Sequence, residues 1–258
     1  MKVVIFAGGL GTRLSEETTL LPKPMIPING KPILWHIMKS YSRYGFNDFI
    51  ILTGYKSYII KDYFVNYHLH QSNISVDIMN NSVEFLDSST EPWKVTLLDT
   101  GETTLTGARL KLASQYLTSS RFLLTYGDGV SDIDMHHQLA FHDTHPGIVT
   151  MAAVQPAGRF GTFTTADDPS KVISFSEKIK TDSSWINGGF FICEPEIFDY
   201  IDNQANVAFE DQPLSTLADL GLLYTYYHHG FWKCMDTLRD KHELHSIAAT
   251  SPYWLSSI

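Results

Sequence analysis

A glycine-rich segment with nearby basic residues lies at the start of the chain and has the composition of a phosphate-binding loop. Residues 7–14 read AGGLGTRL, and residues 21–25 read LPKPM. Glycines let the main chain approach an anion closely and leave its amide groups free to face phosphate oxygens. Thr12 adds a hydroxyl donor, while Arg13 and Lys23 add positive charge. The spacing therefore indicates a triphosphate-binding loop.

Two better-known phosphate loops fit this segment poorly. A Rossmann fingerprint needs a small residue where Leu14 stands, and an immediate helix where Pro22 and Pro24 interrupt the chain. A Walker A loop needs Gly-Lys followed by Ser or Thr, which the segment does not contain. An ordinary surface loop with basic residues is the remaining alternative. Loops of roughly fifteen residues between a strand and its helix are, however, commonly functional.

A carboxylate stands at the end of another predicted strand. Asp128 lies between two glycines directly after the apolar run that ends near Tyr126. Mg²⁺ prefers one or two such carboxylates together with substrate oxygens and water, so Asp128 is a candidate metal ligand. The alternative role is to cap the following helix, a common task for Asp, but Ser131 or Asp132 is better placed to do this.

Apolar runs alternate with amphipathic stretches in the first part of the chain, as they do in β-α-β units. We expect strands at residues 2–7, 48–54, 120–126 and 148–155. We expect helices at residues 32–44, 56–66, 106–117 and 132–144. This pattern predicts an α/β fold with a mostly parallel, Rossmann-like sheet and helices on both faces. Ligands bind at the carboxyl ends of such strands, where the glycine loop and Asp128 lie.

The periodicity changes within residues 73–104, which we interpret as an inserted β-ribbon. Two short strands, at 74–78 and 94–98, flank a polar turn at 80–82. The ribbon carries more apolar area than a lone hairpin can bury: Val76, Ile78, Phe85, Trp93, Val95 and Leu97. We therefore expect a homo-oligomer in which the ribbon packs against another subunit.

The rest of the chain is expected to complete a single domain that spans residues 1–258. Further short strands are predicted after residue 156, at 161–165, 171–177 and 185–192. We interpret residues 156–236 as a second half of the domain that closes over a sugar.

Several segments together resemble the sugar-1-phosphate nucleotidylyltransferases, which join a nucleoside triphosphate to a sugar phosphate. Beyond GGLGTRL and PKPM, the likeness extends to GKPILWHIMK, EPWKVTLLDTG, TYGDGVSD, WINGGFF and HGFWKCMDTLRDK, and so covers nearly the whole chain. The SEET that follows the arginine is similar to the variant found in glucose-1-phosphate cytidylyltransferases. The resemblance implies a Mg²⁺-dependent transfer of CMP from CTP to α-D-glucose 1-phosphate, which gives CDP-glucose, a precursor of surface-polysaccharide deoxysugars. One alternative is an enzyme that uses dTTP or UTP with the same sugar phosphate. The other is a non-catalytic regulatory subunit that binds a nucleotide sugar.

The resemblance also implies roles for individual residues. Arg13 and Lys23 would be catalytic, and Asp128 and Asp236 would bind the metal, although Asp236 could instead cap the helix that follows it. The nucleotide would contact Ala7, Gly8, Gly9, Gly11, Thr12, Arg13, Lys23 and Arg109. The sugar phosphate would contact Tyr126, Gly127, Glu177, Lys178, Asn187 and Gly188. Arg109 could also be an ordinary helix-surface arginine, Tyr126 a packing residue, and the Glu177–Lys178 pair a solvated strand edge.

Composition restricts the partners and the compartment. The net charge of −9 argues against nucleic acid and anionic membrane as partners, because both require a spread of basic surface. No apolar run in the sequence approaches the length of a membrane span. The two cysteines, Cys193 and Cys234, lie far apart, and we interpret them as reduced thiols of a cytoplasmic protein.

Overall fold

A mixed, mostly parallel sheet forms the centre of the molecule. The computed structural model describes residues 1–87, 90–117, 120–156, 162–165, 172–176, 185–202 and 206–255, with the strands at 162–165 and 172–176 described by their backbone alone. The sheet has the order β13-β10-β14-β8-β1-β4-β7, and β15 pairs with β10 outside this path. Its strands are β1 (Lys2–Ala7), β4 (Asp48–Thr53), β7 (Lys94–Asp99), β8 (Phe122–Tyr126), β10 (Val149–Val154), β13 (Ile186–Asn187), β14 (Phe191–Cys193) and β15 (Leu223–His228).

Parallel pairing joins β8, β1, β4 and β7 into one half of the sheet. β14 lies antiparallel between β8 and β10, and β15 is parallel to β10. Alternate residues of the central strands face opposite layers of the core, as expected for strands covered on both sides. Val3 and Ile5 of β1 belong to one buried cluster, and Val4 and Phe6 belong to the other.

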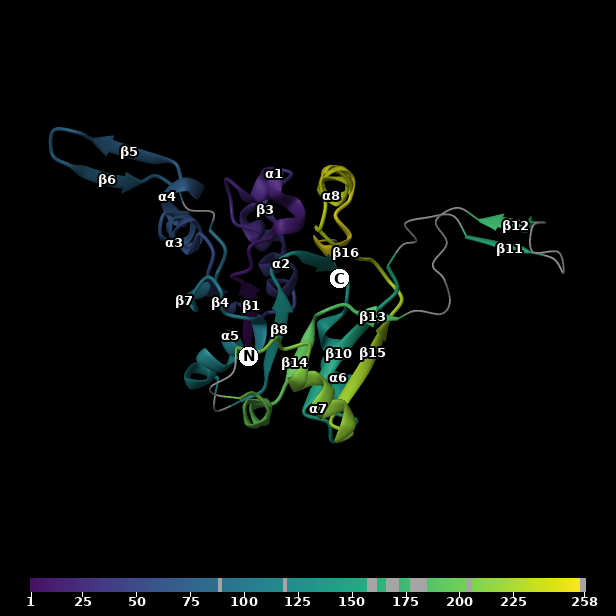
Figure 1. Ribbon diagram of the computed structural model, residues 1–258. Helices are drawn as coiled ribbons and strands as arrows, with labels where there is room; N and C mark the ends of the chain where they lie inside the picture. Colours follow the sequence, from purple (N-terminus) through teal and green to yellow (C-terminus); the bar gives the residue numbers. More distant parts are fainter. Residues whose placement is uncertain are drawn as a thin grey trace.

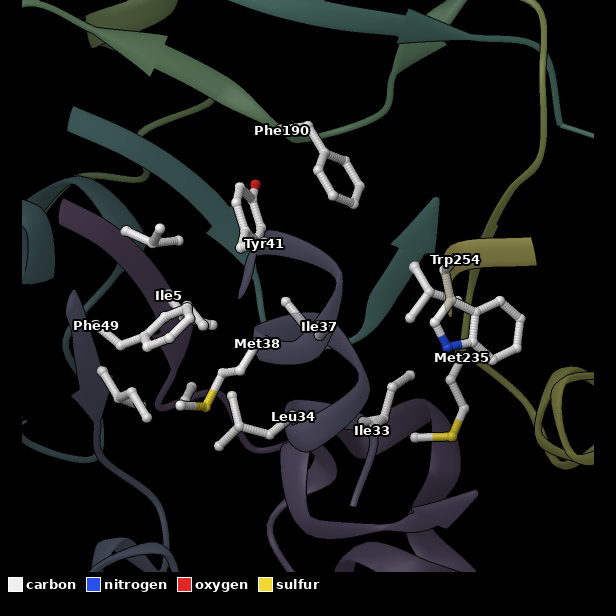
Figure 2. Close-up of a cluster of buried hydrophobic side chains, with 14 of the residues drawn as sticks. Ile5, Ile33, Leu34, Ile37, Met38, Tyr41, Phe49, Phe190, Met235 and Trp254 are labelled. Atoms are coloured by element: carbon white, nitrogen blue, oxygen red, sulfur yellow. The ribbon is translucent and has the colours of Figure 1, made fainter. Parts of the chain in front are cut away.

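Helix α2 provides much of the apolar surface of the first cluster. Figure 2 shows Ile33, Leu34, Ile37 and Met38 of this helix among buried side chains from neighbouring elements, with Tyr41 beside Phe190. The Tyr41 and Phe190 rings stack with their centroids 6.0 Å apart. The helices of the described residues are α1 (Ser15–Thr18), α2 (Ile33–Ser42), α3 (Ser57–Val65), α4 (Tyr67–Gln71), α5 (Thr106–Leu112), α6 (Met135–His142), α7 (Gln212–Asp219) and α8 (Leu238–Thr250).

Short 3-10 helices and two-stranded sheets complete the described structure. The 3-10 helices are η1 (Thr12–Leu14), η2 (Lys23–Met25), η3 (Ser114–Tyr116), η4 (Pro195–Tyr200) and η5 (Tyr253–Leu255). The paired short strands are β2 (Pro27–Ile28) with β3 (Lys31–Pro32), β5 (Ile74–Asp77) with β6 (Ser82–Phe85), β9 (Gly129–Ser131) with β16 (Trp232–Cys234), and β11 (Thr162–Thr165) with β12 (Val172–Ser176). None of the described helices is both long and apolar enough to cross a membrane.

The inserted ribbon is smaller than the sequence predicts. The hairpin consists of β5 and β6 alone, whereas the predicted second strand at 94–98 is part of β7 and pairs in parallel with β4. Trp93, Val95 and Leu97 accordingly pack against the main core. The periodicity was ambiguous because a half-buried edge strand and a ribbon strand both alternate. Figure 1 shows the β5–β6 hairpin extending past α3 and α4, away from the rest of the fold.

Candidate functional site

The glycine-rich loop leaves β1 at its carboxyl end and turns back through η1. Gly11 has φ +65°, a conformation that favours glycine, and a Cβ there would lie 2.7 Å from Thr18 Cγ2. A Cβ at Gly8 would lie 2.1 Å from the guanidinium of Arg109. The two glycines are therefore required by the turn and by a close side-chain approach, and both bring main chain toward the same cavity.

Arg109 holds this loop from within the protein. Its side chain is 3% exposed, and its Nη2 donates to the carbonyl of Gly8 at 3.0 Å. The other acceptors of the guanidinium, at 2.5–3.1 Å, are Thr53 O, Thr100 Oγ1, Gly101 O and Glu102 O. The alternative of a helix-surface arginine is therefore wrong. Contact between Arg109 and a nucleotide stays a prediction, since the group faces protein acceptors in this structure.

Pairing between two short strands brings Asp128 and Asp236 together. Asp128 follows β8 and precedes β9, while Asp236 follows β16, which pairs antiparallel with β9. The amide of Met235 donates to the Asp128 carbonyl at 2.8 Å, which extends the pairing to the two aspartates. Neither aspartate caps a helix, because Asp134 caps α6 and Thr237 caps α8. The expectation that Ser131 or Asp132 caps α6 is therefore wrong: the helix starts later than predicted.

The two aspartates share a single ammonium group. Lys23 Nζ lies 2.7 Å from Asp128 Oδ2 and 2.7 Å from Asp236 Oδ1. Arg13 Nη1 lies 2.8 Å from the other oxygen of Asp236, although most of the Arg13 side chain is exposed. Lys23 itself is 9% exposed and sits in η2, between two prolines that fix the local backbone. The four residues form a compact ion cluster between the glycine loop and the carboxyl end of β8.

Charge pairing outweighs burial in this cluster. Burial alone would lower the pKa of Lys23, but the attraction of Asp128 and the hydrogen bonds to both carboxylates raise it above its usual value. Burial would likewise raise the pKa of Asp236, yet Lys23 and Arg13 hold it below the ordinary range. Near Asp236, burial and the two carboxylates raise the pKa of the Cys234 thiol to about 12, so this cysteine is protonated at neutral pH.

The carboxylate pair has the chemistry of a small divalent cation site. One cationic nitrogen already reaches both side chains at hydrogen-bonding distance, so one metal ion could contact both. Mg²⁺ is commonly held by one or two carboxylates, with substrate phosphates and water completing its ligands. Among the described residues there is no group of three or more His, Cys, Asp or Glu side chains suited to a metal. The pair therefore fits an ion that arrives with phosphate oxygens.

A cavity of about 430 Å³ opens over the glycine loop. It is lined by all eight residues that the sequence analysis assigns to the nucleotide: Ala7, Gly8, Gly9, Gly11, Thr12, Arg13, Lys23 and Arg109. Gly127 and Asp128 close one side of it, and Leu105 and Ala208 lie on its wall. The residues predicted from separate parts of the sequence thus lie around one hollow.

A larger cavity of about 1170 Å³ adjoins the first and shares Arg13, Tyr126, Asp128 and Glu210 with it. Its lining also contains Asn187, Gly188 and Asp236. Because the two cavities share the Asp128 side of the ion cluster, molecules bound in both could meet there. Glu177 and Lys178, which the sequence analysis assigns to the sugar phosphate, lie outside the described residues.

Glu210 is a site residue that sequence reasoning missed. Its carboxylate accepts hydrogen bonds from Tyr126 Oη at 2.5 Å and from Thr106 Oγ1 at 2.6 Å. Asn187 Nδ2 in turn donates to Tyr126 Oη at 3.3 Å, so the chain of bonds crosses from one cavity to the other. Burial and Glu210 raise the pKa of Tyr126 and keep the phenol protonated. Glu210 precedes α7 in a turn without a recognisable motif, so only the three-dimensional structure reveals it.

Trp232 was also missed. It lies in β16 on the wall of the larger cavity and donates from Nε1 to the carbonyl of Gly188 at 2.7 Å. This bond joins the segment that carries Asp236 to the Asn187–Gly188 turn. The resemblance contained the tryptophan within HGFWKCMDTLRDK, but nothing in the spacing distinguished it from a core residue.

Comparison with known proteins identifies the group to which these features belong. A family model described as nucleotidyl transferase matches residues 2–237. The glucose-1-phosphate cytidylyltransferase of Salmonella typhi is 52% identical over 242 residues, which is 93% of each chain. The D-glycero-alpha-D-manno-heptose 1-phosphate guanylyltransferase of Aneurinibacillus thermoaerophilus is 32% identical over 213 residues, covering 81% of this chain and 82% of the relative.

A solved structure has a similar fold. The crystal structure of HddC from Yersinia pseudotuberculosis superposes with a TM-score of 0.67 at 25% identity and covers 95% of this chain and 98% of its own. The predicted α/β fold and the resemblance drawn from the motifs are both confirmed. The chain belongs to the nucleotidyl transferase family.

Proposed function

We propose that this enzyme is a glucose-1-phosphate cytidylyltransferase, which transfers CMP from CTP to α-D-glucose 1-phosphate and releases CDP-glucose and pyrophosphate. The observation that carries the proposal is the pair of adjoining cavities that share Arg13 and Asp128. Identity supports the choice of base and sugar, because the cytidylyltransferase relative is 52% identical and the guanylyltransferase relative is 32% identical.

The smaller cavity would hold CTP with its triphosphate on the glycine loop. The loop amides and Thr12 would donate to phosphate oxygens, while Arg13 and Lys23 would neutralise charge there. Gly8 leaves room for the guanidinium of Arg109, which fixes the loop by holding the Gly8 carbonyl. Arg13 lies on the wall of both cavities, so it is placed to stabilise charge as the reaction proceeds.

The larger cavity would hold the sugar phosphate. Asn187 and the Tyr126–Glu210 pair offer donors and acceptors to sugar hydroxyls, and Gly188 lies on the same wall of the cavity. From the sequence we add Glu177 and Lys178 to this set, with the lysine neutralising the phosphate. Tyr126 and Glu210 line both cavities and would help to hold the two substrates in register.

The chemistry needs no nucleophile from the protein. A phosphate oxygen of glucose 1-phosphate attacks the α-phosphorus of CTP in line, and the bond from that phosphorus to the bridging oxygen of pyrophosphate breaks. A sugar phosphate is already an anion at neutral pH, so no general base is needed. The protein contributes by holding the two phosphates in contact and by neutralising the departing charge through Arg13 and Lys23.

Asp128 and Asp236 would hold Mg²⁺ in this enzyme. When bound, the ion would neutralise phosphate charge and help to orient the reacting groups. Both carboxylates lie on the wall of the larger cavity, and Asp128 also lies on the wall of the smaller one. The pair is therefore placed where the two substrates would meet.

An activity assay with a panel of nucleotides tests the proposal. The purified protein is incubated with Mg²⁺, glucose 1-phosphate and CTP, UTP, dTTP, ATP or GTP in turn, and pyrophosphate release is measured. We expect CTP to give clearly the highest rate. Equal or faster turnover of dTTP or UTP would replace the cytidylyl assignment with the alternative base and leave the enzyme class intact, and no release with any nucleotide would refute the proposed reaction.

We also propose that the enzyme is a homo-oligomer of the cytoplasm. A homo-oligomer joined through the β5–β6 hairpin would cover side chains that are exposed in the single chain. Cys193 and Cys234 are both free thiols, as is usual for proteins of the cytoplasm, where we place this enzyme. CDP-glucose made there would serve as a precursor of deoxysugars for surface polysaccharide.

A further inference from the structure

The four charged groups of the ion cluster neutralise one another. Lys23 binds both Asp128 and Asp236, and Arg13 binds the second oxygen of Asp236. Two positive and two negative side chains are thus paired. The cations that would meet a triphosphate and the carboxylates that would meet a metal ion are in contact with each other instead.

Because of this pairing, a divalent cation alone or a triphosphate alone should bind weakly. A bare divalent cation entering between the carboxylates would face Lys23 and Arg13 at close range, and like charges repel strongly where water is partly excluded. A bare triphosphate drawn to Lys23 would bring its negative charge beside Asp128 and Asp236. When the two arrive together, Asp128 and Asp236 can turn to the metal while Lys23 and Arg13 turn to the phosphates, and every charge keeps a partner.

We propose that Lys23 is a placeholder cation, which occupies the two carboxylates in the free enzyme and makes the site accept metal and triphosphate jointly rather than singly. The inference rests on the assignment of Asp128 and Asp236 to the metal under the proposed function. Lys23 thereby couples two binding events, and such coupling is reciprocal by thermodynamic necessity.

The position of Lys23 suits this exchange. A Cβ at Gly11 would lie 3.2 Å from the Lys23 Cβ, so the lysine stem already lies against the glycine loop. The backbone around Lys23 forms the 3-10 helix η2 between prolines and can remain in place. Only the flexible four-carbon stem must rotate to move the ammonium from the carboxylates to the loop. Arg13 is mostly exposed and can follow without disturbing the core.

Binding of Mn²⁺ to the nucleotide-free protein tests one direction of the coupling. Free Mn²⁺ is counted by electron paramagnetic resonance for the wild type, Lys23→Met, Lys23→Arg and Lys61→Met. We expect Lys23→Met to bind Mn²⁺ about tenfold or more tightly than the wild type, within the usual range of coupling between sites. Lys23→Arg keeps the positive charge and should remain weak. Lys61 pairs with Asp99, which lines neither cavity, so Lys61→Met is the matched control and should also remain weak.

Binding of inorganic tripolyphosphate in the presence of EDTA tests the opposite direction. Asp128→Asn and Asp236→Asn free Lys23 from one carboxylate each, so calorimetry should show tighter metal-free binding than in the wild type. The same substitutions introduced into Lys23→Met should abolish its gained Mn²⁺ binding. If Lys23 merely stabilised the fold, neither the gain in Mn²⁺ binding nor the gain in tripolyphosphate binding would be seen. Loss of stability does not create affinity for a cation in one variant and for an anion in another.

Two results would overturn the inference. One is tight Mn²⁺ binding by the free wild-type protein that Asp128→Asn or Asp236→Asn abolishes. The other is unchanged Mn²⁺ affinity in a folded Lys23→Met, or in Lys23→Gln if the first variant does not fold. Neither readout depends on CTP or on turnover. Failure of the cytidylyl assignment in the nucleotide assay would leave these results standing, and an active enzyme with uncoupled Mn²⁺ binding would refute the placeholder role alone.

Discussion

At the scale of single residues, Asp128 and Asp236 can be tested by removing their charge while keeping their size. If both hold the metal beside the reacting phosphates, Asp128→Asn and Asp236→Asn should each lower kcat by roughly 10² to 10⁴, since a catalytic metal contributes several kcal/mol and about 1.4 kcal/mol corresponds to a factor of ten. Steady-state kinetics at limiting Mg²⁺ measures this. Asp134, which caps α6, provides the matched control. Asp134→Asn should leave kcat near the wild-type value, and a folded Asp128→Asn or Asp236→Asn that did the same would contradict the metal role of that aspartate.

The ion cluster also predicts how stability depends on pH. Burial alone would raise the pKa of Asp236, but Lys23 and Arg13 hold it below the usual range of an aspartate. A carboxyl whose pKa is depressed by folding stabilises the protein fully above its unfolded pKa, and this contribution is lost as the pH falls through the folded pKa. The free energy of unfolding should therefore drop below pH ~4. Urea denaturation across this range should show a shallower drop for Asp236→Asn, and parallel curves would contradict the assignment.

At the scale of elements, the sequence predicted the parts that local patterns determine. The strands at 2–7 and 48–54 and the helices at 32–44 and 56–66 agree with β1, β4, α2 and α3, because long apolar runs and amphipathic stretches have distinct periods. Pairing between distant strands was beyond this reasoning. The β9–β16 pair joins residues about a hundred positions apart and is what brings Asp128 to Asp236. The motifs therefore indicated the site residues singly, while their contacts with Lys23 and the role of Glu210 required the structure.

Arg109 links α5 to the glycine loop, and its removal should show first in stability. Arg109→Met keeps much of the apolar length but removes the donor to Gly101 O and one of the two donors to Gly8 O, which still accepts from the amide of Tyr55. Losing hydrogen bonds to a charged group costs about 1.5–3 kcal/mol, so we expect the free energy of unfolding to fall by roughly that amount. Denaturant titration measures this against Arg239→Met, an exposed arginine whose loss should matter little. A fall in nucleotide affinity without a fall in stability would show instead that Arg109 contacts the ligand directly.

At the scale of the whole molecule, an acidic protein places basic side chains on the walls of its two cavities. The chain carries a net charge of −9, yet Lys23 and Arg13 both line the smaller cavity, and Arg13 lines the larger one as well. They remain beside carboxylates there, which limits the attraction of the site for stray anions. Specificity for a metal–triphosphate pair over either component would thus be built into the charge arrangement, in addition to the shapes of the cavities.

The β5–β6 hairpin remains the part of the molecule that a single chain does not explain. Ile78 and Met79 at its turn are 86% and 93% exposed, and Val76, Val83 and Phe85 are exposed along its strands. An isolated two-stranded hairpin is marginally stable in water, so we expect another subunit to cover these side chains. Sedimentation velocity at micromolar concentration should show an oligomer for the wild type and smaller species for Ile78→Ser with Met79→Ser. Val65→Ser, which removes an exposed apolar residue of α3, should sediment like the wild type. A monomeric wild type, or an unchanged oligomer after the double substitution, would exclude the hairpin as the subunit contact.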